Sequence, residues 1–128
     1  MPEFKKEERL CAKKSIDFLF KNGKPMFSYP FNVKWHYAEL ATTFPVQVLI
    51  VVSKRNFKKA TDRNRIKRLI REAYRLNKHI LYQYLNEKNK NIVLTLIYTE
   101  KEILNYHFIA DKIILTLQRL IKLQEKAD

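Results

Sequence analysis

Residues 46–76 read VQVLIVVSKRNFKKATDRNRIKRLIREAYRL, a β-branched apolar run followed by a long amphipathic helical pattern. The run at 46–52 is typical of a central, buried strand. A second such run, IVLTLIY, occupies residues 92–98, and the helical pattern from 62 to about 84 lies between the two. We therefore expect two core strands connected by a helix that packs on their sheet.

Weaker patterns extend this core toward the N-terminus. Residues 31–37 alternate apolar and polar, which is typical of a strand with one buried face, and residues 24–28 indicate a short edge strand. Before them, residues 15–23 predict a short helix that Ser15 caps and that Gly23 ends in the left-handed conformation.

The C-terminal part predicts one more helix. Thr99 and Glu102 have the spacing of a capping box, and the helix is expected to run to about Leu123. The order of elements predicts a single α+β domain over residues 1–128, a two-layer sandwich with helices mostly on one side of a small sheet. Residues 1–10 and 124–128 are expected to be flexible.

The charge of the chain is strongly positive and concentrated in one segment. The 128 residues include 26 Lys or Arg and 13 Asp or Glu, a net charge of +13. Residues 54–78 alone hold 11 basic and two acidic residues. Such an excess is typical of a protein that binds a polyanion, with nucleic acid the first candidate and an anionic membrane the second.

The remaining composition favours a soluble protein of the cytoplasm. The single cysteine, Cys11, excludes an internal disulfide framework and suits a reducing compartment. No apolar run approaches the roughly 18 residues that span a bilayer, and the first nine residues contain no signal-peptide core.

The helical pattern has two distinct faces. Its apolar side chains fall on one side and are expected to pack on the sheet. The opposite side carries Arg63, Asn64, Lys67, Arg68, Arg71 and Arg75. Like charges three and four residues apart destabilise a helix by roughly a few tenths of a kcal/mol each, so we expect an anionic partner. There are two alternatives to an anionic partner for this face: it is simply solvated, or the helix lies on a membrane. The lack of Trp and Phe on the apolar side argues against the membrane.

Arginine favours RNA over duplex DNA as the partner, because guanidinium groups bind phosphates and stack on unpaired bases. Aromatic side chains can act as stacking platforms for such bases. Phe20 is the best candidate, since it ends a short helix beside the open face of the sheet.

No catalytic centre is recognisable in the sequence. His36, His79 and His107 are scattered, and no His or Cys spacing is typical of zinc. The acidic residues do not converge as a metal-dependent nuclease requires, and Asp62 at a helix start is explained by capping. We expect the chain alone to make and break no covalent bond.

Residues 52–73 contain the pattern Ala-x-x-Arg-Asn-x-x-Lys-Arg-x-x-Arg, met by Ala60, Arg63, Asn64, Lys67, Arg68 and Arg71. With this pattern the segment resembles the protein subunit of bacterial ribonuclease P. The resemblance extends to Arg9 and Leu10, to residues 18–23 (FLFKNG) and to the strand at Phe31, and so covers nearly the whole chain.

This resemblance implies a fold and a role. The fold is an α-β-β-β-α-β-α sandwich with a left-handed crossover. In that family a large RNA subunit is the ribozyme, and the protein helps it to remove the 5′ leader from precursor tRNA. Activity depends on Mg²⁺ that is held mainly by the RNA. The implied partners are the catalytic RNA and precursor tRNA, with no membrane and no obligate protein partner.

The resemblance also implies the binding residues. The face toward the catalytic RNA, with its basic approach loop, would comprise Lys54, Arg55, Lys58, Lys59, Arg63, Asn64, Lys67, Arg68, Arg71 and Arg75. The cleft for the single-stranded leader would include Phe20, with Ile16 where many members have Phe and Lys34 near a position often filled by Tyr. Leader binding is therefore expected to depend less on stacking and more on charge. Lys58 and Lys59 replace a Gly-Asn pair often found in that loop.

Two other functions stay open at this point. A different basic RNA-binding module, such as a ribosomal protein, could share the helix alone, and the joint presence of residues 17–23 and the later arginine pattern argues against it. A self-sufficient nuclease would need metal ligands on the protein.

Overall fold

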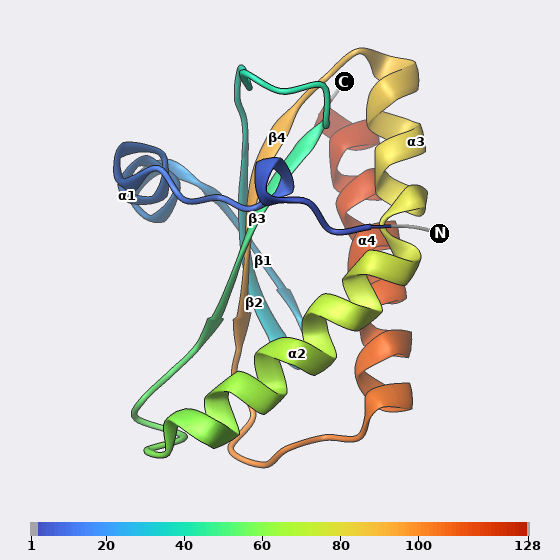
Figure 1. The fold of residues 1–128 in the computed structure, drawn as a ribbon. Coiled ribbons are helices and arrows are strands. Elements are labelled where there is room, and N and C mark those ends of the chain that lie inside the picture. The colour runs from blue at the N-terminus through green and yellow to red at the C-terminus, as the bar shows by residue number, and fades with distance from the viewer. Residues whose placement is uncertain (1–2, 128) are drawn as a thin grey trace.

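The computed structural model describes residues 3–127. A four-stranded sheet forms its centre, in the spatial order β1-β2-β4-β3, and four α-helices pack around it (Figure 1). The strands are β1 (Lys24–Ser28), β2 (Phe31–Tyr37), β3 (Val46–Val52) and β4 (Ile92–Tyr98). The helices are α1 (Lys13–Asn22), α2 (Ala60–Asn77), α3 (His79–Lys88) and α4 (Tyr106–Ala127), with a 3₁₀ turn at Lys6–Glu8.

The sheet has one heavily covered face and one open face. Helices α2, α3 and α4 lie on one side, and α1 lies on the other (Figure 1). Strands β3 and β4 are parallel neighbours, while the other pairs are antiparallel. The connection from β3 through α2 and α3 to β4 is left-handed, whereas nearly all such crossovers are right-handed. The α+β sandwich and its unusual crossover are thus confirmed.

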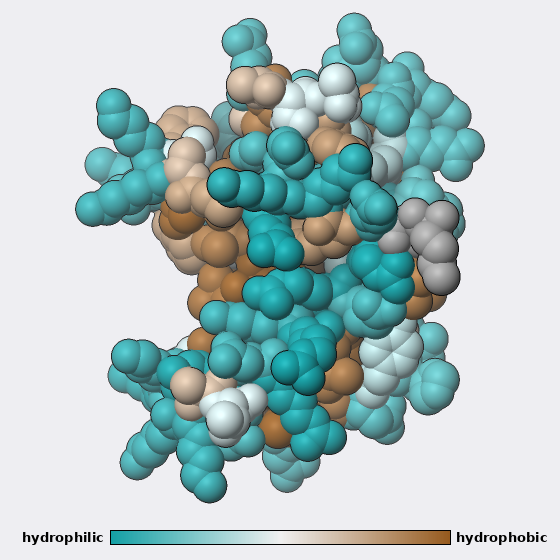
Figure 2. Space-filling model, in the orientation of Figure 1, coloured by the Kyte–Doolittle hydropathy of each residue, from teal (hydrophilic) through white to brown (hydrophobic). Residues whose placement is uncertain are grey.

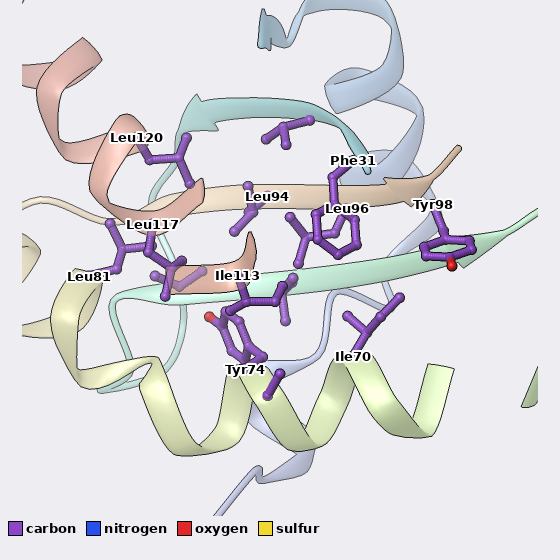
Figure 3. Close-up of a cluster of buried hydrophobic side chains, with 14 of the residues drawn as sticks. Phe31, Ile70, Tyr74, Leu81, Leu94, Leu96, Tyr98, Ile113, Leu117 and Leu120 are labelled. Carbon is purple, nitrogen blue, oxygen red and sulfur yellow. The ribbon is translucent and has the colours of Figure 1, made fainter. Parts of the chain in front are cut away.

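The core lies between the sheet and the three helices. Alternate residues of β2 and β4, among them Phe31, Leu94 and Leu96, point toward the helices and are buried (Figure 3). Ile70 of α2 and Ile113 of α4 pack into the same cluster and are fully buried. Each such side chain stabilises the fold by roughly 1.5–3 kcal/mol. All four predicted strands are confirmed.

The predicted single helix over residues 62–84 is wrong in one respect, because the structure divides it at Lys78. Helix α2 crosses the sheet, and α3 then turns to run beside α4 (Figure 1). The turn places Leu81 and Leu85 in the cluster that contains Leu117 and Leu120 of α4. A straight continuation of α2 would not follow α4, so packing between helices sets the break.

The predicted helix ends also differ from the structure. Helix α1 begins at Lys13 rather than after Ser15, and no side chain caps it. Helix α2 begins at Ala60, two residues before the predicted start at residue 62. At α4 the Asn105 side-chain oxygen accepts a hydrogen bond from the Phe108 amide at 2.9 Å. Thr99 instead donates to the Pro30 carbonyl, since tertiary contacts compete with local capping.

Gly23 ends α1 for a reason other than the predicted one. Its φ is −63°, which is not left-handed. A Cβ at this position would instead collide with the Leu19 carbonyl oxygen and lie 3.2 Å from Cβ of Lys34. Glycine is therefore required mainly because the chain passes close to the Leu19 carbonyl as α1 ends, and the nearness of β2 adds a second tight contact.

The terminal segments make specific contacts with the body. Leu10 is buried beneath α1, and its amide donates to the Val48 carbonyl at 2.9 Å, beside the edge of β3. Glu8 is fully buried, and α4 continues to Ala127 with Gln124 buried. Glu8 and Leu10, within the segment 1–10 that is predicted to be flexible, are thus buried against the body, whereas residues 1, 2 and 128 lie outside the described residues.

Candidate nucleic-acid interface

The basic face predicted on α2 forms a single surface. Hydrophilic side chains cover α2 and the loop before it, while hydrophobic side chains line the recess between that loop and α1 (Figure 2). The predicted residues that are exposed are Lys54, Arg55, Lys58, Lys59, Asn64, Arg68 and Arg71. Those that are partly buried are Arg63, Lys67 and Arg75. The structure therefore brings together all ten residues on the loop and on one helix.

Arg63 holds the approach loop to the helix. Its guanidinium donates to the carbonyl oxygens of Phe57 at 2.7 Å and Lys58 at 3.0 Å. At the other end of the loop, the Ser53 hydroxyl accepts from the Arg55 amide at 3.0 Å. These bonds hold the backbone of the loop at both ends, and Arg63 therefore has a structural role in addition to its charge.

Three cations of α2 keep their charge available for a partner. Among residues 3–127, Lys67, Arg68 and Arg71 form no salt bridge. Arg75 differs, because its guanidinium pairs with the Glu72 carboxylate at 2.6 Å. The hydrogen bond from Arg75 lowers the pKa of Glu72, so this pair stays charged at neutral pH. The free positive charge is therefore concentrated in the first three turns of α2.

Arg9 extends the basic face beyond the predicted residues. Partial burial, and then the positive charge of nearby Arg9, lower the pKa of the Arg71 guanidinium, which remains protonated at neutral pH. The guanidinium of Arg9 also lies over the Phe4 ring, 5.3 Å from its centroid. Helical periodicity could not find Arg9, because it lies far from α2 in sequence.

A buried ionic network holds the segment that carries Arg9. The Glu8 carboxylate accepts from Lys78 at 2.5 Å and from the Tyr82 hydroxyl at 2.8 Å. Its second oxygen accepts from the Lys5 amide at 2.7 Å. Burial, and then the neighbouring Tyr74, raise the pKa of Tyr82, so this phenol remains a donor. The network fastens the N-terminal segment where α2 meets α3.

The open face of the sheet carries the candidate leader cleft. Lys34 of β2 donates to the Phe20 carbonyl at 2.6 Å, in the last turn of α1, and its ammonium lies 5.8 Å from the centroid of the Phe20 ring. Beside this pair is a hollow of about 340 Å³, here named the sheet groove, lined by Pro25, Met26, Phe27, Asn32, Val33, Lys34 and Ile97. An apolar floor with an exposed aromatic ring and a cation at its rim suits an unpaired nucleotide.

The third predicted cleft residue lies elsewhere on α1. Ile16 is half-buried and packs on the cluster of Leu10, Leu19 and Val93, so it joins α1 to the sheet rather than lining the sheet groove. Sequence reasoning did not single out Phe18, which is exposed and meets the His36 ring edge-on at 5.1 Å. The only indication of Phe18 in the sequence is its position within residues 18–23, which are part of the family resemblance.

The sequence matches a known protein family over most of its length. The family model described as Ribonuclease P matches residues 4–113. The chain belongs to the Ribonuclease P family. The ribonuclease P protein component of Porphyromonas gingivalis is 41% identical over 83 residues, which are 65% of this chain and 61% of that protein. The alignment therefore spans less than two thirds of the length of this relative.

Solved structures of the same family share the fold. The ribonuclease P protein of Thermotoga maritima superposes with a TM-score of 0.70 at 26% identity, covering 88% of this chain and 96% of its own. The protein from Staphylococcus aureus superposes with a TM-score of 0.66 at 21% identity, covering 90% and 96%. The family match includes the N-terminal segment from Phe4, β4 and the first part of α4, so it is not confined to the arginine-rich helix.

Proposed function

We propose that this chain is the protein subunit of ribonuclease P, which assists a catalytic RNA in the endonucleolytic removal of the 5′ leader from precursor tRNA. Family membership, and the presence in one domain of a basic helix and a groove on the open face of the sheet, support the proposal. The single observation that carries most weight is the uncompensated charge of Lys67, Arg68 and Arg71 on one helix face. A face of this kind binds a polyanion because it releases the counterions of its phosphates.

The α2 face is proposed to bind the catalytic RNA. Lys54, Arg55, Lys58 and Lys59 lead into this face from an exposed loop that Arg63 shapes. Asn64, Lys67, Arg68 and Arg71 would contact phosphates and base edges along the helix, and Arg75 would contribute at its end. Because Arg75 is paired with Glu72, we expect it to contribute less than Arg68.

The open sheet face is proposed to bind the single-stranded leader. Phe20 would stack on a base, and Lys34 would attract the adjacent phosphate while it holds the end of α1. Ile16 would affect leader binding indirectly, because it packs α1 against the sheet and does not line the sheet groove. A protein that binds the leader gives precursor tRNA an advantage over mature tRNA, which has none.

The chemical step is proposed to belong to the RNA. Among residues 3–127, no group of three or more His, Cys, Asp or Glu side chains is placed to hold a metal ion. Mg²⁺ would be held mainly by the RNA subunit. The part of the chain that the structure describes has no helix able to cross a membrane. We propose that the protein acts in the cytoplasm, where its RNA partners would be.

The test is cleavage of a precursor tRNA by bacterial ribonuclease P RNA at low Mg²⁺, with and without this protein. We expect strong stimulation when protein and RNA are both present and no cleavage by the protein alone. The variant Lys67→Ala/Arg71→Ala should lose most of the stimulation, and the matched control Lys14→Ala/Lys88→Ala, which removes two exposed charges away from α2, should keep it.

Each other outcome would overturn a different part of the proposal. Tight, salt-sensitive RNA binding without stimulation would indicate a general RNA-binding module. Cleavage by the protein alone would locate the active site on the protein. Equal losses for the two double variants would show that net charge, and not the α2 face, is responsible.

A further inference from the structure

A second hollow lies on the far side of edge strand β1 from the sheet groove. It has a volume of about 310 Å³ and is here named the α4 groove, lined by Met26, Phe27, Arg119, Lys122, Leu123 and Lys126. Met26 and Phe27 also line the sheet groove. The two hollows are therefore adjacent, with only one short strand between them.

Phe27 is the most exposed large hydrophobic side chain recorded among the described residues, at 58%. It is paired with Asn32 in the register of β1 and β2, and so belongs to the open face while it borders the α4 groove. An exposed ring at the junction of two grooves offers a stacking surface to a base that passes from one groove to the other.

The charge of the α4 groove is of one sign. Its ionisable lining residues are Arg119, Lys122 and Lys126, with no carboxylate among them. These cations are three and four residues apart on α4, so they repel one another unless an anion lies between them. Arg119 approaches the Ser28 hydroxyl at 3.4 Å, which keeps its guanidinium beside β1.

We propose that the α4 groove is a second subsite for single-stranded RNA, which receives phosphates of a strand that leaves the sheet groove over Phe27. This inference rests on the proposed function, since the strand would be the distal part of the leader. Charge complementarity and continuity with the sheet groove identify RNA as the occupant. A peptide strand added to β1 is the weaker alternative, because Pro25 has no amide hydrogen to pair with it.

The experiment compares two precursor tRNAs in the reconstituted holoenzyme. One leader is just long enough to fill the sheet groove, and the other is several times as long. Lys122→Ala and Lys126→Ala, at residues that line the α4 groove and not the sheet groove, should each reduce affinity for the long leader by about three- to fivefold, and leave affinity for the short leader unchanged. Lys122→Ala should also lower the salt dependence of long-leader binding by about 0.7 in the log–log slope.

Lys88→Ala, at the exposed end of α3, is the matched control and should affect neither leader. Thermal unfolding of each variant establishes that it is folded. If the wild-type protein stimulates cleavage but Lys122→Ala and Lys126→Ala leave the long-leader advantage unchanged, the α4 subsite is wrong and the proposed function stands. If the wild-type protein fails to stimulate cleavage of either substrate, the proposed function itself fails. Equal losses for both leaders would overturn the subsite in favour of general electrostatic attraction.

Discussion

Removing the Glu8 carboxylate should destabilise the protein far more than its place in a polar N-terminal segment indicates. Glu8 is fully buried and accepts hydrogen bonds from Lys78, the Tyr82 hydroxyl and the Lys5 amide. In Glu8→Ala, the Lys78 ammonium loses its carboxylate partner in a site where the Lys78 side chain is only 12% exposed. The Tyr82 hydroxyl loses an acceptor at the same time.

The expected size of the loss follows from these contacts. Removing one partner of a buried ion pair typically lowers the free energy of unfolding by about 3–5 kcal/mol. Lys78 also donates to the Glu3 carbonyl, so its charge keeps one partner and the lower end of that range applies. For a domain of this size, about 3 kcal/mol corresponds to a decrease in Tm of roughly 10 °C.

Urea unfolding followed by circular dichroism measures this loss, with Glu7→Ala as the matched control. Glu7 is the exposed neighbour of Glu8, and its replacement should change stability by less than about 0.5 kcal/mol. Glu8→Gln, which keeps the volume and one acceptor, should fall between the two. If Glu8→Ala and Glu7→Ala had the same midpoint of unfolding, the buried network would not fasten the N-terminal segment.

Four further substitutions test other parts of the structure. Arg68→Ala should weaken binding of the catalytic RNA by about 1 kcal/mol and lower the salt slope by about one, and an unchanged slope in a salt titration would contradict this. Phe20→Ala should reduce affinity for precursor tRNA by roughly 1 kcal/mol or more, and an equal loss for mature tRNA would remove Phe20 from the leader site. Gly23→Ala should lower the free energy of unfolding by about 1–3 kcal/mol, since its Cβ meets the Leu19 carbonyl, and an unchanged urea midpoint would refute the steric argument. Arg63→Lys should speed hydrogen exchange at residues 53–59, because an ammonium cannot reproduce the two-carbonyl geometry, and equal protection would show that the loop needs no such support.

Local patterns in the sequence were sufficient for the strands and for the chemistry of the basic helix. A continuous apolar run identifies the buried strand at 92–98. Alternation identifies the half-buried one at 31–37, because each side chain of a strand faces opposite to its neighbours. The same reasoning separates Arg68 and Arg71 from Ile70, since a helix repeats every 3.6 residues. The left-handed crossover came from the family resemblance and from no local pattern.

Contacts between residues that are distant in sequence decided the helix boundaries and the composition of the binding surfaces. The break at Lys78, the start of α4 at Tyr106 and the glycine at the end of α1 depend on what each element packs against. Arg9 joins the basic face because tertiary contacts hold its segment, namely the pair of Glu8 with a lysine 70 residues away and the bond from the Leu10 amide to the Val48 carbonyl. Two grooves meet at Phe27 because β1 forms the edge of the sheet beside α4. Local sequence thus determined which residues bear charge and which are apolar, whereas tertiary structure alone decided which of them share a surface, since no helical or strand period relates residues so far apart.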